Sequence, residues 1–205
     1  MPIRVVLFDL GGVVCHFLPE RRLAALAKAS GLPESEVYAR IWKSGLDRQV
    51  DRGDFTAEGV HRAFAEKLGL TLDYEEFSAL VTLGFEPNAD VLTVVDAVRR
   101  EVRTGLLTDN GPVLLRAMPR RFPEIVRRFD WLLFSSEMKA LKPSPELFAR
   151  VLERLEQRAE EVLLIDDSMP NVEGARAVGL QACHYTDIES LRRDLSRFGL
   201  SVSPG

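Results

Sequence analysis

Five polar side chains of this chain have types that suit one kind of chemistry. They are Asp9, Thr108, Lys142, Asp166 and Asp167. A carboxylate can attack phosphorus as a nucleophile, and a lysine can neutralise negative charge as a point cation. Two adjacent carboxylates suit a hard divalent cation, which prefers oxygen ligands. Together these groups indicate the transfer of a phosphoryl group.

Asp9 has the clearest setting of the five. It follows the apolar run Val5–Phe8 and precedes Leu10, Gly11 and Gly12. The run predicts a buried strand, because it is rich in β-branched and aromatic residues. A carboxylate that ends such a strand points into the crevice where open α/β sheets bind ligands. A lone Asp would more often only cap the strand, so the prediction depends on the other segments.

Each of the other segments also has an ordinary interpretation. Thr108 alone could be a turn residue, and Lys142 alone could be a solvated surface lysine. Asp166 and Asp167 could simply begin a loop, although adjacent carboxylates repel each other and favour a nearby cation. All of them stand at expected strand ends or loops, and this joint occurrence carries the functional prediction.

Strands and helices are predicted to alternate in the second half of the chain. The predicted strands, with the N-terminal one, are 3–9, 102–107, 131–134, 162–165 and 180–184. The predicted helices are 89–100, 112–118, 145–154, 171–178 and 191–198. Strands separated by helices predict a parallel sheet with right-handed crossovers.

Between the first strand and this region, the pattern predicts helices and no strand. Two cover 19–30 and 33–46, a third opens at Asp54 or Thr56 and runs to 68, and a fourth begins at the capping-box pair Asp73 and Glu76. We therefore predict an α/β fold. A Rossmann-like parallel-sheet core is expected from residues 1–14 and 88–205, and an all-helical cap from residues 15–87.

Composition narrows the classes of partner. The 27 basic and 31 acidic residues give a net charge of −4, which does not suggest a nucleic-acid-binding surface. Two cysteines, Cys15 and Cys183, are too few for a disulfide framework or a zinc cluster. No apolar run approaches the ~20 residues of a membrane span, and the start does not resemble a secretory signal. We expect a soluble, cytoplasmic protein without a membrane partner; the sequence does not indicate its oligomeric state.

Four motifs together resemble the haloacid dehalogenase superfamily. They are Val6–Val13 (VLFDLGGV), Leu107–Thr108, Lys142–Pro143 and Leu164–Ala175. The Phe-Asp-Leu-Gly-Gly start and the helical cap are most similar to sugar-phosphate phosphatases of the bacterial glucose-1-phosphatase type. They are also similar to the phosphatase domain of soluble epoxide hydrolases.

This resemblance implies an Mg²⁺-dependent phosphatase that acts on a small phosphorylated molecule through an aspartyl-phosphate. Asp9 is expected to be the nucleophile. Mg²⁺ would be held by Asp9, Asp167 and the backbone carbonyl of Gly11, and Asp166 belongs to the same metal group. Ser168 and Asn171 are expected to orient Asp167.

Four residues are expected to bind or activate the substrate. Thr108 would donate a hydrogen bond to a phosphate oxygen, and Lys142 would neutralise charge. Asp109 and His16 are further candidates. Asp109 stands where relatives more often carry Asn, so we expect it either to turn away or to be partly protonated and donate a hydrogen bond.

Gly11 departs from the family pattern, in which a second Asp two residues after the nucleophile acts as a general acid and base. Three explanations are open: good leaving groups, replacement of the acid by His16 or Asp109, or loss of catalysis. General acid–base catalysis contributes about 10²–10⁴-fold, so the difference matters.

Three alternative functions remain at this point. A metal-independent 2-haloacid dehalogenase uses the same nucleophile, but it would not need the pair Asp166–Asp167. A catalytically silent regulatory protein is favoured only by Gly11. A phospho-receiver domain carries its acidic pair after the first strand and has no helical insert, so it fits less well.

The cap is expected to contact the substrate. The possible contacts are His16, Phe17, Arg21, Arg22 and Trp42. For each of them, a place in the cap's own core or on a solvated face is the favoured interpretation.

Overall fold

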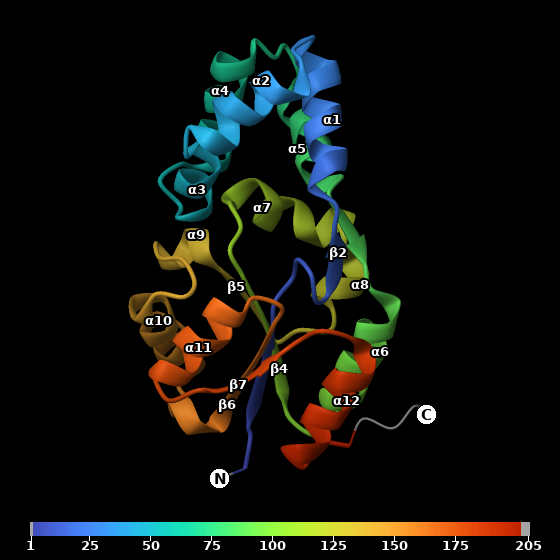
Figure 1. Cartoon of the computed structure of the whole chain (residues 1–205), viewed down its shortest axis with the longest axis vertical. Helices are drawn as coiled ribbons and strands as arrows, with labels where there is room; N and C mark the ends of the chain where they lie inside the picture. The colour runs from blue at the N-terminus through green and yellow to red at the C-terminus, as the bar shows by residue number, and fades with distance from the viewer. Residues whose placement is uncertain (1, 202–205) are drawn as a thin grey trace.

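Five parallel strands form the centre of the lower half of the molecule in Figure 1, a computed structural model that describes residues 2–201. The strands are β1 (Val5–Phe8), β4 (Arg103–Thr108), β5 (Trp131–Phe134), β6 (Val162–Asp166) and β7 (Gln181–His184). Their order in the sheet is β5-β4-β1-β6-β7, and every neighbouring pair is parallel. This arrangement confirms the predicted α/β core.

Strand β1 is buried on both faces because helices cover both sides of the sheet. Val6 and Phe8 pack into one hydrophobic cluster and Val5 and Leu7 into the other, as the alternation of side chains along a strand requires. The first cluster is covered by α6 (Ala89–Val98), α7 (Pro112–Arg121) and α12 (Ile188–Arg197). The second is covered by α10 (Pro145–Leu155) and α11 (Met169–Ala177). Short helical segments complete the core: α8 (Pro123–Val126), α9 (Ser135–Met138) and η2 (Ala159–Glu161).

Residues 15–87, here called the insert, lie between β1 and α6 in the sequence, and their helices stand above the sheet in Figure 1. Its helical segments are α1 (Pro19–Ser30), α2 (Glu34–Tyr38), η1 (Ala39–Lys43), α3 (Leu46–Asp51), α4 (Ala57–Leu68) and α5 (Tyr74–Thr82). They enclose a hydrophobic cluster of their own, to which Val113 of α7 also contributes. Helix α7 therefore packs against both the sheet and the insert.

Two short strands connect the insert to the core, so the prediction of an all-helical segment is wrong at its ends. Strand β2 (Cys15–Phe17) pairs antiparallel with β3 (Phe85–Pro87), and Cys15 lies opposite Pro87. Three residues are too few to show an alternating pattern. The two partners also lie at opposite ends of the insert, so no local signal links them.

The helix predicted over 33–46 is also interrupted. It comprises α2 and a π-helical turn (η1) that ends at Lys43, and a separate helix that the sequence did not predict, α3, begins after Gly45, whose φ is 81°. A π-turn shifts the helical phase, and such turns are frequent at functional sites. Here Ile41 is buried in the insert's core, whereas Trp42 is only half-buried. The predicted capping box of Asp73 and Glu76 is confirmed at the start of α5.

The insert also touches the core where α3 meets α9. Ser135 Oγ donates to the backbone oxygen of Asp51 at 2.6 Å, and Lys139 Nζ donates to that of Gly53. A Cβ at Gly53, whose φ is 84°, would lie 2.0 Å from the Ser136 carbonyl oxygen. This close approach fixes the end of α3 against the core. Among the described residues, no helix has both the length and the apolar character needed to cross a bilayer.

Candidate active site

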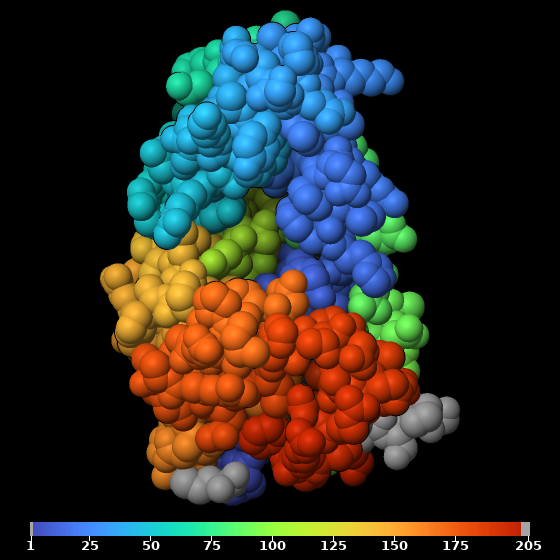
Figure 2. All heavy atoms as spheres, in the orientation of Figure 1, coloured from blue at the N-terminus to red at the C-terminus, as the bar shows by residue number. Residues whose placement is uncertain are grey.

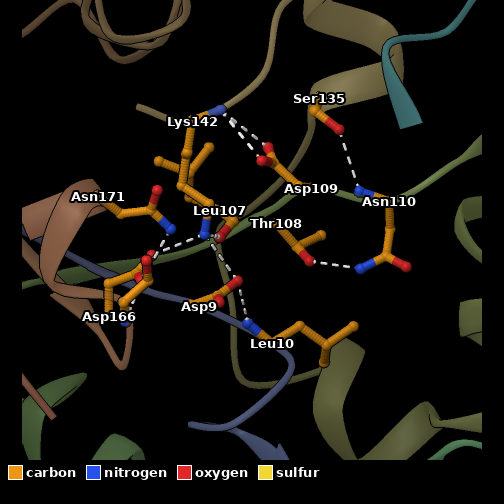
Figure 3. A network of polar contacts seen from close by, with 11 residues as sticks. Asp9, Leu10, Leu107, Thr108, Asp109, Asn110, Ser135, Lys142, Asp166 and Asn171 are labelled. Atoms are coloured by element: carbon orange, nitrogen blue, oxygen red, sulfur yellow. Dashed lines mark hydrogen bonds and ion pairs between the residues drawn. The ribbon is translucent and has the colours of Figure 1, made fainter. Parts of the chain in front are cut away.

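The carboxyl ends of three neighbouring strands bring the predicted site residues together (Figure 3). Asp9 follows β1, Thr108 ends β4 and Asp166 ends β6, and β1 lies between the other two strands in the sheet. The backbone N–H of Asp9 donates to the carbonyl of Ile165 at 2.9 Å, which extends the ladder up to the site. The sheet order thus explains why residues far apart in sequence meet here.

Lys142 lies between two of the carboxylates. Its Nζ is 2.9 Å from Asp9 Oδ1 and 2.7 Å from Asp166 Oδ2, and it also donates to the Leu107 carbonyl at 3.3 Å. Its side chain is only 2% exposed. Burial alone would lower the pKa of Lys142, but the surrounding carboxylates raise this pKa above its usual value. Lys142 therefore stays a cation and can neutralise charge, but it cannot supply a proton at neutral pH.

Asp9 has a strongly perturbed carboxyl group. Burial, with a smaller contribution from nearby Asp166, raises the pKa of Asp9 to about 7, although Lys142 and the Leu10 N–H oppose the shift. The Leu10 N–H donates to Asp9 Oδ1 at 2.7 Å. A further cation beside Asp9 would favour the ionised carboxylate, which is the nucleophilic form.

A group of three carboxylates could hold such a cation. Asp9, Asp166 and Asp167 each offer one oxygen, and these oxygens lie within 4.8 Å of one another. An all-oxygen donor set of this kind fits a hard ion such as Mg²⁺ and does not suit a softer metal that prefers nitrogen or sulfur.

The members of this group differ in their bonding. Asp166 Oδ2 binds Lys142, and Asp166 Oδ1 accepts from the Ser168 N–H at 2.9 Å and from Asn171 Nδ2 at 3.0 Å. The expectation that Ser168 and Asn171 orient Asp167 is therefore wrong, because both hold Asp166. Asp167 is exposed, and this leaves it better placed than Asp166 to bind an ion.

Gly12 is required by the position of Asp167. Gly12 has φ of 84°, and a Cβ there would lie 2.0 Å from Asp167 Oδ2. Only glycine permits both the left-handed backbone and the close approach of the carboxylate. Gly11 differs from Gly12 in its backbone, because its φ lies outside the left-handed region. It lines the cavity described below.

We expect Gly12→Ala to destabilise the protein by about 1–2 kcal/mol from the left-handed backbone, with a further loss from the displacement of the Asp167 carboxylate. Gly31→Ala is a matched control, because Gly31 has φ of 69° and no atom within 4 Å of the added Cβ. It should cost only about 1 kcal/mol. Urea unfolding of both variants measures the difference, and equal losses would show that Asp167 is not confined by Gly12.

Thr108 and Asp109 form the other side of the site. Thr108 Oγ1 accepts from Asn110 Nδ2 at 2.8 Å, so its own hydrogen stays available for a ligand. Both Asp109 oxygens accept from the backbone N–H of Lys142, each at 3.1 Å. Burial raises the pKa of Asp109 despite the opposing charge of Lys142. In this geometry Asp109 accepts a hydrogen bond and positions the lysine loop; among the described contacts it donates none.

A cavity of about 650 Å³ lies between the insert and the core, above these residues. Figure 2 shows the surface hollowed between the two parts. The core side of the lining is Asp9, Gly11, Thr108, Asp109, Asn110, Lys142 and Asn171. The insert side is Phe17, Pro19, Glu20, Arg22, Leu23, Tyr38, Trp42, Asp47, Asp51 and Phe85.

The structure separates the proposed cap contacts into two groups. Phe17, Arg22 and Trp42 line the cavity, although the sequence favoured a place in the core or on a solvated face. His16 lies exposed on β2 and is not among the described residues that line the cavity. Arg21 pairs instead with Glu86 at 2.7 Å.

Sequence reasoning missed Asp47 and Asp51, which also line the cavity. The two are four residues apart and therefore share one face of α3. This spacing was the only available signal, and it is also typical of a solvated helix face.

Comparisons with known proteins identify the family that the four sequence motifs resemble. A family model described as haloacid dehalogenase-like hydrolase matches residues 3–179. A phosphorylated carbohydrates phosphatase of Thermotoga maritima is 36% identical, over 87% of this chain and 83% of its own length. A bifunctional epoxide hydrolase 2 of Rattus norvegicus is 31% identical over 96% of this chain and 39% of its own length.

A solved structure has a similar fold. It is an enzyme of the same family from Bacteroides thetaiotaomicron, in complex with magnesium and inorganic phosphate. Its TM-score is 0.75 at 23% sequence identity, and the match covers 90% of this chain and 94% of the other. The parallel-sheet core and its helices are thus shared with that structure.

Proposed function

The chain belongs to the haloacid dehalogenase-like hydrolases, and on this basis we propose an Mg²⁺-dependent phosphatase that hydrolyses small phosphomonoesters, such as sugar phosphates, through an aspartyl-phosphate. One observation carries the proposal: Asp9 lies at the floor of the cavity, in contact with Lys142 and within reach of Asp166 and Asp167. Relatives named as phosphatases support the same reaction.

In the first step, a carboxylate oxygen of Asp9 attacks phosphorus. The new bond joins Asp9 to the phosphoryl group, and the bond from phosphorus to the alcohol oxygen breaks. Thr108 donates its hydroxyl hydrogen to a phosphoryl oxygen, and Lys142 offsets the negative charge. The alcohol oxygen leaves with the electron pair of the broken bond and takes up a proton from water, because Gly11 stands where the family carries its general acid. In the second step water attacks phosphorus, releases inorganic phosphate and a proton, and restores Asp9.

Mg²⁺ would be held by Asp9, Asp167 and the carbonyl of Gly11. When bound, it supplies positive charge between the nucleophile and the phosphate, which otherwise repel each other. Four carboxylates, Asp9, Asp109, Asp166 and Asp167, lie around one ammonium group, so the site has a deficit of positive charge for binding a phosphate dianion. This charge balance favours a metal-dependent phosphatase over a metal-independent dehalogenase.

We propose that the insert, residues 15–87, is a cap that covers the cavity and excludes water, while residues 1–14 and 88–205 supply the reacting groups. A cap that opens and closes would admit the substrate and release the products. A small phosphorylated molecule is the expected partner. A cytoplasmic location stays a prediction from the sequence, which cell fractionation can test.

The first experiment is phosphate release from a panel of sugar phosphates and an aryl phosphate, with Mg²⁺ or with a chelator. We expect release with Mg²⁺ and a loss of at least about 100-fold with the chelator. Halide release from a 2-haloacid in the presence of chelator would instead support the dehalogenase. Folded, metal-loaded protein that releases neither product would favour a silent binding protein.

A further inference from the structure

Arg22 is a cation on the insert side of the cavity with no ion-pair partner within 4.0 Å among residues 2–201. Its Nε is buried and has no hydrogen-bond partner. Its guanidinium carbon lies 4.9 Å from the centre of the Trp42 ring, and Trp42 in turn stacks on Tyr38. Such a cation–π contact holds the guanidinium in place at the cavity wall.

The contrast with the preceding residue is informative. Arg21 is exposed and forms an ion pair with Glu86 at 2.7 Å, so its charge is already compensated. A buried polar group without a partner costs free energy, unless a ligand or water completes its hydrogen bonds. The Arg22 side chain lines the cavity that contains the proposed nucleophile, and its guanidinium forms no hydrogen bond or ion pair among residues 2–201, so its outer N–H groups are available to a ligand.

The carboxylates that act on the pKa of Arg22 belong to α3. Asp51 and Asp47 raise the pKa of Arg22 through their charges, whereas burial, the larger effect, lowers it. Burial also raises the pKa of Asp51 to about 7, against the opposing effect of Arg22. Arg22, Asp47 and Asp51 all line the cavity, which thus combines hydrogen-bond donors on Arg22 with acceptors on α3.

The charges of the whole cavity restrict what can bind there. Its lining contains five carboxylates and two cations: Asp9, Glu20, Asp47, Asp51 and Asp109, with Arg22 and Lys142. Lys142 is committed to Asp9 and Asp166. A leaving group with its own carboxylate or second phosphate would therefore meet an excess of negative charge. A hydroxyl group can instead accept from a guanidinium and donate to a carboxylate.

We propose that Arg22, together with Asp47 and Asp51, binds the leaving group and selects a neutral one with several hydroxyl groups, such as a polyol or a sugar, over an anionic one. The apolar walls, which include Phe17, Leu23, Trp42 and Phe85, provide surfaces for the carbon skeleton. This inference rests on the proposed phosphatase function, and it names the residues that set the choice of substrate.

The test compares three esters with the Mg²⁺-loaded enzyme: a pentitol phosphate, phosphoglycolate and p-nitrophenyl phosphate. The wild type should prefer the pentitol phosphate to phosphoglycolate by at least about tenfold in kcat/KM. Arg22→Met should lower kcat/KM for the pentitol phosphate by at least about tenfold, mainly through KM. The ratio of kcat/KM between the pentitol phosphate and p-nitrophenyl phosphate should fall by at least about tenfold, because the aryl leaving group has no hydroxyl groups for Arg22 to bind.

Arg21→Met is the matched control, since it removes the neighbouring charge without changing the cavity lining, and it should leave all three values unchanged. A double variant, Asp47→Asn with Asp51→Asn, tests the proposed selectivity independently of Arg22→Met. It should raise the relative kcat/KM for phosphoglycolate by at least about tenfold, because Arg22 is then no longer offset by negative charge.

Two results would overturn the inference while the phosphatase itself stands. One is an equal loss on all three esters in Arg22→Met, which is the signature of a structural role. The other is a wild-type preference for phosphoglycolate. Wild-type enzyme that releases no phosphate even from p-nitrophenyl phosphate would overturn the phosphatase, and this inference with it.

Discussion

Asp9→Asn is expected to abolish phosphate release, with a loss of at least about 1,000-fold in kcat. The amide has nearly the same shape as the carboxylate, but it cannot form the acyl bond to phosphorus under these conditions. The variant should also weaken Mg²⁺ binding, because one of the three clustered carboxylates is lost. Steady-state kinetics on the aryl phosphate measures the first effect, and titration calorimetry with Mg²⁺ measures the second.

Folding should survive this substitution. Lys142 keeps its 2.7 Å ion pair with Asp166 in this variant, and the amide oxygen can still accept from Lys142 and from the Leu10 N–H, so no buried charge is left without a partner. Asp90→Asn, an exposed change in the first turn of α6, is the control and should keep full activity. A folded Asp9→Asn variant that retains more than a few per cent of the wild-type rate would remove Asp9 from its proposed role.

Lys142→Met is expected to have the second largest effect, and on two properties at once. The variant loses the only ammonium group within contact of Asp9 among the described residues, so kcat should fall by about 10²–10⁴-fold. It also leaves Asp9 and Asp166 buried without their cation. Breaking a buried ion pair from one side costs about 3–5 kcal/mol, and urea unfolding measures this loss.

The stability loss in Lys142→Met should depend on pH. The pKa of Asp9 is already raised in the folded protein, and the loss of Lys142 removes an effect that lowers it. Between its unfolded pKa, near 4, and this raised folded value, the native state binds more protons than the unfolded state, so stability falls as pH rises.

The variant should therefore be closer to wild type at pH 5 than at pH 8, measured without metal. Lys28→Met, an exposed change on α1, should show neither effect. A constant difference across this range would mean that Asp9 does not take up the proton when Lys142 is absent.

The core of the site was predictable because two strongly apolar runs are each ended by a polar residue, which alone would be a weak signal. Val5–Phe8 and 162–165 are apolar runs that can only be buried strands, and a polar residue ends each one. Parallel strands bring their carboxyl ends to one edge, so Asp9 and Asp166 had to be neighbours if β1 and β6 were. The pairing of these two strands confirms this reasoning for the fold.

Side-chain partners were less predictable than strand ends. Ser168 and Asn171 follow Asp167 in sequence, but both bind Asp166. Helix α11 begins at Met169, between these two residues, and brings Asn171 back to Asp166. Lys139 adopts φ of 53°, in the region that favours glycine, and no local pattern indicates this. Its ammonium group reaches Gly53 of the insert, a contact that depends on how the two parts pack.

The insert side of the cavity was the hardest part to predict. Arg22 and Trp42 lie in two different segments predicted to be helical. A face of such a helix is usually either packed in a core or exposed to solvent. Ile41 and Trp42 are consecutive in η1, so they face different directions: Ile41 is buried in the insert's core, whereas Trp42 lines the cavity. Which side of this segment meets the cavity depends on how the insert packs on the core, and no periodic pattern shows that.

The ribbon of β2 and β3 has a consequence for protein engineering. Because Cys15 and Pro87 are paired, the chain leaves and re-enters the core at a single point. A segment with adjacent ends can be exchanged for another of different length without moving the strands that it interrupts. We therefore predict that the insert is a replaceable module: a chimaera that joins this core to a foreign insert at 17 and 85 should keep the reacting groups while receiving a new selectivity. Its designer would have to rebuild the packing of Val113 and the contact at Gly53, where this insert is fitted to this core.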